Sequence, residues 1–252
     1  MDGHRDIVVL DTAEDICRFM IGKWKEIAQG ALEERGYFAA ALSGGKTPVD
    51  FFKGLSALGG TFPWERTHIF VVDERFVLLT HPDSNYGLVT ALFLDSVGIP
   101  RQNCHPVPVD EPSPELSARK YEEDIKTFFR LSKGEFPRFD LIHLGIGEDG
   151  HTASLFPGSS AVQEKSRLVV GTVPKNKRHD RITLTLPVIN NGRNVVFLVQ
   201  GKGKAGVLKR VILGESSLPA TLVRPGKGKL FFVADRAAGE LLTAEEIVGL
   251  GS

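Results

Sequence analysis

Three polar clusters in the sequence carry residue types that can do chemistry, and each follows a short apolar run. The clusters are residues 43–48, 73–75 and 145–151, and the apolar runs before them are residues 37–42, 68–72 and 139–144. If these runs are parallel strands of one sheet, their carboxyl ends line a single ligand crevice. We therefore expect the three clusters to converge on one site.

The first cluster, Ser-Gly-Gly-Lys-Thr-Pro, is suited to binding an anion. Gly44 and Gly45 permit positive φ angles and a close approach of the backbone to a ligand. Thr47 is a good cap for a following helix, and Pro48 suits its first position. Backbone N–H groups at such a helix start favour phosphate. The alternative is a tight strand-to-helix turn without a ligand, and the glycine spacing does not match a Walker loop.

The third cluster has the spacing G-x-G-x-x-G between Gly145 and Gly150. We reject a dinucleotide site, because Pro157 interrupts the helix that should follow and the next strand candidate has no acidic residue at its end. The cluster instead places Asp149 and His151 on a glycine-rich backbone. A histidine that titrates near neutral pH is the usual general base, so His151 is the candidate for that role.

Cationic residues near the other clusters suggest that the ligand is negatively charged. Arg75 belongs to the Asp-Glu-Arg cluster, and a guanidinium suits bidentate contact with phosphate or carboxylate; a surface ion-pair cluster is the alternative. Lys175 and Arg181 lie in a basic stretch, and Lys204 follows a glycine turn into a predicted helix. A lysine at a helix N-terminus opposes the helix dipole, so a bound phosphate would explain Lys204, with solvated surface lysines as the alternative.

Several other classes of site and protein are not indicated. The sequence has no H-E-x-x-H or other metal-ligand spacing and no G-x-S-x-G elbow, so neither a metal nor a covalent serine is suggested. Lys plus Arg and Asp plus Glu both number 31, a balance that argues against a broad nucleic-acid surface. No apolar run reaches 18 residues, no signal-peptide pattern occurs, and only two cysteines are present. We expect a cytoplasmic protein, a monomer, that binds no membrane.

Short apolar runs alternate with longer amphipathic ones along the chain, which predicts an α/β fold. Predicted strands are residues 7–10, 37–42, 68–72, 139–144, 168–171, 181–186, 194–199 and 230–234. Predicted helices are residues 13–35, a segment from a Ser113-Pro114 cap to Phe129, and residues 204–213. Most strands lack strict alternation, as expected for a mainly parallel sheet flanked by helices. We expect one domain over residues 1–252, with a long proline-rich connection at 98–114.

With these residues assembled, the chain resembles the 6-phosphogluconolactonase family, the lactonase branch of the glucosamine/galactosamine-6-phosphate isomerase superfamily. The resemblance covers about residues 37–235 and is most specific at 139–158, where D-G-H-T-A-S-L-F-P-G occurs without a gap. Supporting matches are L-S-G-G at 42–45, D-E-R at 73–75, S-N at 84–85, R-I-T-L-T at 181–185 and K-A at 204–205.

This resemblance implies a Rossmann-like domain that hydrolyses 6-phospho-D-glucono-1,5-lactone to 6-phospho-D-gluconate in the oxidative pentose phosphate pathway. It implies no metal and no organic cofactor, and a sugar-phosphate lactone as the small-molecule partner. It assigns the general base to His151 and the phosphate-side lysine of the superfamily to Lys204. The predicted catalytic residues are His151, Asp149 and Arg75, and the predicted substrate or phosphate contacts are Ser43, Gly44, Gly45, Asp73, Asn85, Gly147, Lys175, Arg181 and Lys204.

The expected mechanism is attack of water on the lactone carbonyl, with neutral His151 taking the proton and Asp149 either orienting the imidazole or only shaping the loop. The rival within the superfamily is a glucosamine-6-phosphate deaminase. That reaction uses a glutamate where this sequence has Phe156, and a phenyl ring cannot transfer a proton. A sugar-phosphate sensor without catalysis is the rival of another class, and it would not need Asp149 and His151 together.

Overall fold

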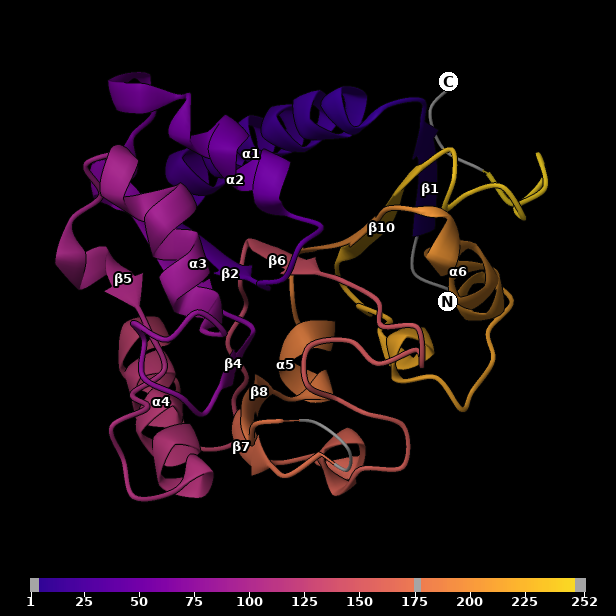
Figure 1. Ribbon diagram of the computed structural model, residues 1–252. Helices are drawn as coiled ribbons and strands as arrows, with labels where there is room; N and C mark the ends of the chain where they lie inside the picture. The colour runs from indigo at the N-terminus through magenta and orange to yellow at the C-terminus, as the bar shows by residue number, and fades with distance from the viewer. Residues whose placement is uncertain (1–4, 175–177, 248–252) are drawn as a thin grey trace.

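A seven-stranded parallel sheet runs through the middle of the molecule, with helices on both of its faces (Figure 1). This computed structural model describes residues 5–174 and 178–247 of the chain. The strands lie in the order β1-β10-β9-β6-β2-β3-β5, and every neighbouring pair is parallel. Their bounds are β1 Arg5–Leu10, β2 Phe38–Leu42, β3 Thr67–Val71, β5 Cys104–His105, β6 Leu141–Leu144, β9 Asn194–Val199 and β10 Lys229–Asp235.

The central strands are apolar throughout because both faces of the sheet are covered. In β2, Phe38, Ala40 and Leu42 point into one hydrophobic core. Ala39 and Ala41, which alternate with them, point into the other core. A strand with one solvated face would instead alternate apolar and polar residues. The predicted α/β fold, a mainly parallel sheet flanked by helices in one domain, is confirmed.

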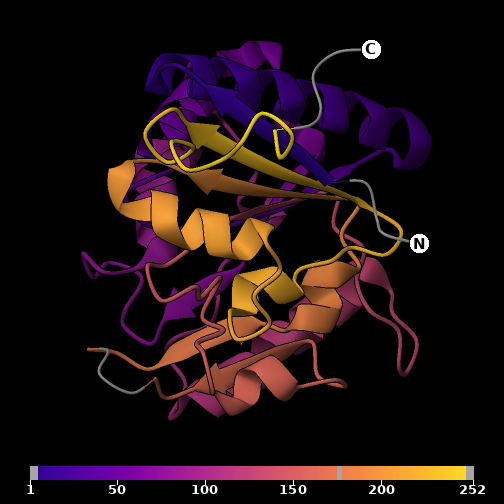
Figure 2. The ribbon, with the colours of Figure 1, turned by 90° about the vertical axis from the view of Figure 1, so that its right-hand side faces the viewer.

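Within residues 5–174 and 178–247, three α-helices cover each face of the sheet. The core on one side receives α1 (Ala13–Arg35), α2 (Val49–Ser56) and α3 (Asn85–Leu92), and the core on the other side receives α4 (Pro114–Phe129), α5 (Leu186–Asn190) and α6 (Ala205–Ile212). Figure 2 shows the strands near the C-terminus between α1 above and α6 below. Short 3-10 helices lie at Gly59–Thr61, Trp64–Arg66, Leu94–Ser96, Arg101–Asn103, Ser160–Gln163, Lys202–Lys204 and Pro219–Leu222.

The ends of the two longest helices follow from local capping. The Thr12 side chain accepts a hydrogen bond from the backbone N–H of Asp15 at the start of α1, and Gly36 ends this helix with φ of 79°. Ser113 caps α4 in the same way, with Pro114 in its first turn as predicted. Both helices therefore begin at a capping side chain, and α1 also ends at a glycine, whereas α4 ends at Arg130 with φ of 52°.

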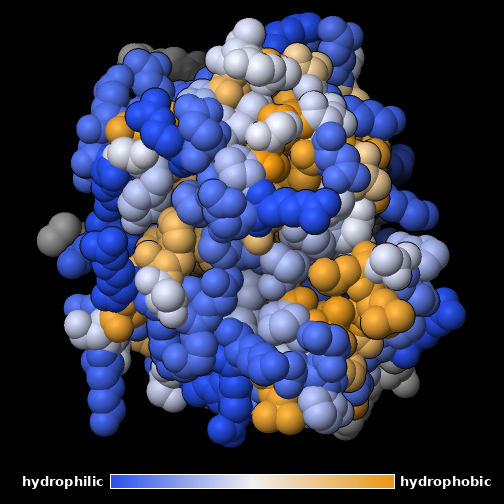
Figure 3. Space-filling view, turned by 90° about the vertical axis from the view of Figure 1, so that its left-hand side faces the viewer, coloured by the Kyte–Doolittle hydropathy of each residue, from blue (hydrophilic) through white to orange (hydrophobic). Residues whose placement is uncertain are grey.

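The exterior is largely polar where α3 and α4 lie. The face on the left-hand side of Figure 1 is mainly hydrophilic, with apolar areas between the polar side chains (Figure 3). Helix α4 buries Ala118, Tyr121 and Ile125 against the sheet, and most of its charged side chains, apart from the buried Glu122, face outward. Among the helices that the structure describes, none has the length and apolar character needed to cross a membrane.

A second, antiparallel sheet corrects part of the predicted strand arrangement. It has three strands in the order β4-β8-β7, with bounds β4 Asp73–Arg75, β8 Arg181–Leu184 and β7 Val169–Thr172. The predicted strands at 168–171 and 181–186 belong to this second sheet and not to the parallel one, and residues 73–75, where no strand was predicted, form β4. Only eight residues join β7 to β8, whereas a parallel pair needs a crossover of about a dozen residues or more.

The topology opens a crevice between β2 and β6. From β2 the chain proceeds through β3 to β5 on one side of the sheet, and from β6 it proceeds through β9 to β10 on the other side. The loops that follow β2 and β6 therefore turn away from each other, as at the ligand-binding switch point of open α/β sheets. Two of the three polar clusters, residues 43–48 and 145–151, occupy these two loops.

Candidate active site

A pocket of about 310 Å³ lies at the carboxyl ends of β9, β6, β2 and β3, four neighbouring strands of the parallel sheet. Of the twelve residues predicted for the site, ten line this pocket: Ser43, Gly44, Gly45, Asp73, Arg75, Asn85, Gly147, His151, Arg181 and Lys204. Asp149 does not line it but is hydrogen bonded to His151. Lys175 lies outside the described residues, so the structure says nothing of its position.

The loop after β6 holds the imidazole of His151 in one tautomer. His151 Nδ1 lies 2.5 Å from Asp149 Oδ1, and the backbone N–H of Gly147 donates to the carbonyl of His151 at 2.8 Å. Because a carboxylate only accepts hydrogen bonds, Nδ1 carries the proton and the lone pair of the neutral ring lies on Nε2. A Cβ on Gly147 would lie 2.0 Å from Nδ1, so the ring occupies space that only glycine leaves open.

The residues after His151 connect this loop to the second sheet. Ser154 Oγ donates to Asp73 Oδ2 at 2.7 Å, and both side chains are buried. Between His151 and Ser154, Ala153 has φ of 51°, in the left-handed region that a non-glycine residue adopts only at an energetic cost. Ser154 was not among the predicted site residues, although it belongs to the D-G-H-T-A-S motif. It orients Asp73 within the pocket wall.

Glu74 has a structural role that the sequence did not indicate. Its buried carboxylate accepts hydrogen bonds from the backbone N–H groups of Arg75, Asn85 and Tyr86 and from Ser84 Oγ, at 2.7–3.0 Å. Burial raises the pKa of this carboxyl, and the backbone hydrogen bonds act in the opposite direction. A negative charge at the start of α3 also stabilises the helix. The surface ion-pair interpretation of residues 73–75 is therefore wrong.

Asn85 fits against the glycine loop. Its Nδ2 donates to the backbone carbonyl of Asp73 at 2.8 Å, which fixes the amide plane. A Cβ on Gly44 would lie 2.1 Å from Asn85 Oδ1, so glycine is required there by close packing. Gly45 has φ of 97°, which glycine adopts freely. Thr47 does not cap α2, contrary to expectation: the helix begins at Val49, Pro48 precedes it, and no side chain caps it.

Two arginines face each other across the antiparallel ladder, because Arg75 of β4 pairs with Arg181 of β8. Arg75 Nη1 donates to the carbonyl of Asp83 at 2.5 Å, and Arg181 Nη1 donates to the carbonyl of His179. Burial, followed by the charge of Arg75, lowers the pKa of Arg181. Two guanidinium groups brought together in this way favour an anion between them.

Lys204 lines the pocket from the turn that follows β9. It ends the 3-10 helix Lys202–Lys204 and directly precedes α6. Gly201, which begins this turn with φ of 90°, donates its N–H to Asp235 Oδ2 at 2.9 Å. The carboxylate therefore anchors the turn that presents Lys204 to the pocket.

His143 lines the pocket but was not singled out in the sequence. Its imidazole is buried in β6, and neither ring nitrogen has a hydrogen-bond partner among the described residues. Burial lowers the pKa of His143 to about 4, so the ring is neutral at physiological pH. Ser43 Oγ, also buried, likewise has no partner within the described parts of the chain. The sequence signal that could have identified His143 is the presence of a polar residue near the carboxyl end of an otherwise apolar, buried strand.

Comparison with known proteins identifies consistent relatives. A family model described as glucosamine-6-phosphate isomerases/6-phosphogluconolactonase matches residues 11–232. The 6-phosphogluconolactonase of Synechocystis sp. is 43% identical over 84% of this chain and 88% of that protein. The 6-phosphogluconolactonase of Homo sapiens is 39% identical over 83% and 82%, respectively. The solved structure of 6-phosphogluconolactonase from Thermotoga maritima matches with a TM-score of 0.80 at 32% identity, covering 91% of this chain and 99% of that one.

Proposed function

Because the chain belongs to the glucosamine-6-phosphate isomerase/6-phosphogluconolactonase family, we propose that it hydrolyses 6-phospho-D-glucono-1,5-lactone to 6-phospho-D-gluconate. This is the second reaction of the oxidative pentose phosphate pathway. The observation that carries the proposal is the Asp149–His151 pair, whose imidazole lines the same pocket as Arg75, Arg181 and Lys204. A general base and a group of cations in one pocket are what a phosphorylated lactone needs.

Substrate binding begins with the phosphate. The backbone at Gly44 and Gly45 and the cations Arg75, Arg181 and Lys204 line the pocket together. Charge-assisted hydrogen bonds to phosphate are the strong ones in proteins. A pocket of about 310 Å³ is at the small end of the usual range for ligand sites, which suits one sugar phosphate. The cations balance the phosphate charge, so the neutral lactone ring is left to lie against the loop after β6.

Hydrolysis then needs one proton to move twice. The Nε2 lone pair of His151 takes a proton from the water that attacks the lactone carbonyl, while Asp149 holds Nδ1–H and stabilises the imidazolium that forms. Arg75 or backbone N–H groups stabilise the oxyanion of the tetrahedral intermediate. The imidazolium returns the proton to the ring oxygen as the C–O bond breaks. In this scheme the chain's own groups supply every step, and no metal or cofactor is used.

Phe156 separates this proposal from the deaminase activity of the same family. Its ring centroid lies 4.7 Å from that of His151, within the pocket lining. A phenyl ring at this place offers no group that transfers a proton to open a sugar ring. The Phe156 ring instead packs beside the imidazole and offers it an apolar neighbour. The position therefore favours lactone hydrolysis over deamination.

The test is acid release from freshly prepared 6-phosphogluconolactone, corrected for spontaneous opening. We expect strong acceleration by the wild-type protein and no ammonia from glucosamine 6-phosphate. His151→Asn should lower kcat by roughly 10²-fold or more and retain binding of 6-phosphogluconate. Ammonia release at a comparable rate would assign the deaminase reaction instead. Product binding without any acceleration of acid release would indicate a sensor.

We propose further that the protein works as a cytoplasmic monomer, folded as one domain over residues 1–252, without nucleic-acid or membrane partners. The equal numbers of acidic and basic residues support the absence of a nucleic-acid partner, because nucleic-acid binding depends on excess positive charge. Sedimentation of the purified protein at several concentrations tests the monomer. A mass near twice 27.5 kDa would show a dimer.

A further inference from the structure

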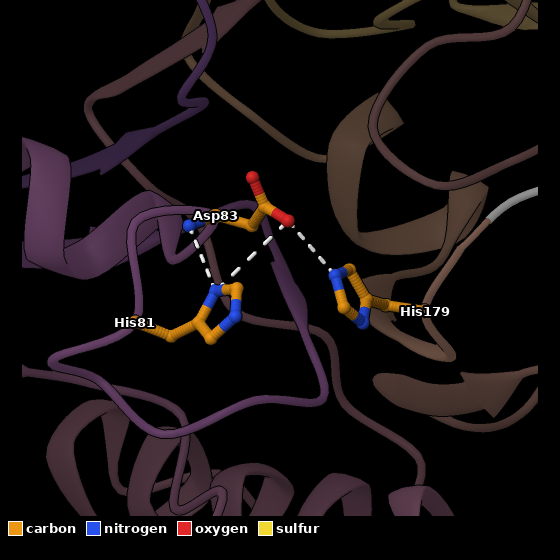
Figure 4. Close-up of side chains that lie close together, drawn as sticks. All are labelled: His81, Asp83 and His179. Atoms are coloured by element: carbon orange, nitrogen blue, oxygen red, sulfur yellow. Dashed lines mark hydrogen bonds and ion pairs between the residues drawn. The ribbon is translucent and has the colours of Figure 1, made fainter.

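His81, Asp83 and His179 converge on one point between two loops (Figure 4). His179 Nε2 lies 2.9 Å from Asp83 Oδ2, and His81 Nδ1 lies 3.9 Å from the same oxygen. One nitrogen of each ring and a carboxylate oxygen all lie within 4.8 Å of one another. The three side chains are 34%, 39% and 17% exposed in sequence order. None of them lines the pocket that contains His151.

We propose that His81, Asp83 and His179 form a binding site for a divalent transition metal ion of the zinc class. Two imidazole nitrogens and one carboxylate oxygen are ligands that Zn²⁺ prefers, and solvent would complete a tetrahedral shell. Ligand atoms about 2.0–2.1 Å from a tetrahedral zinc lie roughly 3.3–3.5 Å apart. Rotation of partly exposed side chains brings the three groups to this spacing without movement of the sheets.

The site must give up three existing interactions when the ion binds, one of which is the hydrogen bond that His179 Nε2 donates to Asp83 Oδ2. The backbone N–H of Asp83 donates to His81 Nδ1 at 3.0 Å, and Arg178 Nη1 lies 3.5 Å from Asp83 Oδ2. The Arg178 side chain is exposed and can return to solvent. His179 Nε2 has to release the proton that it now donates to Asp83, which the other ring nitrogen can carry instead, so that its lone pair faces the ion.

The bound ion would connect the two loops that hold the pocket's arginines. The carbonyl of Asp83 accepts from Arg75, and the carbonyl of His179 accepts from Arg181. In the protein without metal, a single side-chain hydrogen bond joins Asp83 to His179. Coordination of both side chains by one ion fixes both carbonyls, and with them the two guanidinium groups. The site therefore acts as a brace beside the pocket and takes no part in proton transfer.

Zinc binding can be measured without substrate, so its outcome does not depend on the proposed lactonase activity. Chelator-treated full-length protein is titrated with Zn²⁺ in competition with a chromophoric chelator. We expect one ion per chain, and His81→Ala and His179→Ala should each weaken binding by more than the roughly 10–100-fold that loss of an outer hydrogen-bond partner costs. His151→Asn is the matched control, because it removes the other histidine–aspartate pair of the pocket region and should leave zinc affinity unchanged.

Two further measurements, of thermal stability and of the Co²⁺ spectrum, distinguish binding at this cluster from misfolding of the variants and from metal binding by cysteine. Zn²⁺ should raise the melting temperature of the wild-type protein but not of His81→Ala, since a ligand that binds only the folded state stabilises it. The metal-free variants should melt with the wild type, which shows that they fold. Co²⁺ in the site should give a spectrum without thiolate charge-transfer absorption, because no cysteine belongs to the cluster. The absence of saturable binding, or zinc affinity that is lost in His151→Asn and kept in His81→Ala, would overturn the proposal.

Discussion

Replacing Gly147 by alanine should move the imidazole of His151 and leave the fold intact. The added Cβ would lie 2.0 Å from His151 Nδ1, 2.1 Å from Cε1 and 2.7 Å from Asp149 Oδ1. Ordinary contact begins at 3.4 Å, so the ring has to retreat by about 1.4 Å. A misplacement of about 1 Å at a reacting group costs on the order of 10²-fold in rate. We therefore expect kcat to fall by at least about 10²-fold in Gly147→Ala.

The fold should tolerate this change because the groups that must move are the ends of two side chains. Gly147 does not have a positive φ, so the alanine backbone is not strained. We expect the free energy of unfolding to change by about 1 kcal/mol or less, because the displaced side chains are partly exposed and can turn toward solvent. The cations of the pocket are untouched, so binding of 6-phosphogluconate should also stay close to wild type.

The assay compares kcat, KM, product affinity and melting temperature in Gly147→Ala and in a control, Gly206→Ala. An added Cβ on Gly206 meets nothing within 4 Å, and Gly206 does not line the pocket. The control should behave as wild type in all four measurements. Wild-type kcat in Gly147→Ala would refute the reasoning, because it would mean that the position of the His151 ring does not limit the reaction.

Lys204→Ala should raise KM by roughly 10- to 150-fold with little change in kcat, as expected for the loss of a charged hydrogen bond worth about 1.5–3 kcal/mol. The control in the same kinetic assay is Lys202→Ala, because the Lys202 side chain is 81% exposed and lies outside the pocket lining. Asp149→Asn should lower kcat/KM by only about tenfold or less, because the Asp149 side chain is 44% exposed and solvent screens its charge. If kcat/KM falls as far as in His151→Asn, Asp149 is itself essential to the reaction. Below pH 7 the protein should lose stability, because burial lowers the pKa of His143 from 6.5 to about 4 and the unfolded chain takes up the proton first. Denaturant unfolding between pH 7 and 4 should show that the free energy of unfolding falls by about 3 kcal/mol because of this group. The variant His143→Leu should therefore lose less stability in acid. If its pH dependence is unchanged, the loss belongs to other groups, such as His68, whose pKa burial also lowers to about 4.

Local features of the sequence were enough to predict most elements. The strand at 194–199 and the helix at 13–35 have the predicted bounds. The helix has a capping threonine before it and a glycine with positive φ after it, both of which act through neighbouring residues. Helices α3 and α5 were not predicted, and for α2 only a helix start near Thr47 and Pro48 was expected, without bounds. Helices α2, α3 and α5 are short, at eight, eight and five residues, so their periodicity is weak and their stability comes from tertiary packing.

The composition of the site could be anticipated for a related reason. Parallel strands end at a common edge, so polar residues that directly follow buried strands gather there. The clusters at 43–48 and 145–151 illustrate this, since they follow neighbouring strands of the sheet. The residue types at the ends of these strands thus indicated both a general base and a binding site for an anionic ligand, without knowledge of the tertiary structure.

Only the tertiary structure decided which groups touch. The pairing of Arg75 with Arg181, the hydrogen bond from Ser154 to Asp73 and the contact of His179 with Asp83 each join positions about 80 to 106 residues apart. Such contacts depend on the antiparallel β4-β8-β7 sheet, whose strand pairing the strand pattern did not indicate. Periodicity and capping are properties of neighbouring residues, whereas strand partners are chosen by the packing of the whole chain. The sequence by itself therefore determined the chemical groups of the site, and tertiary packing determined their partners.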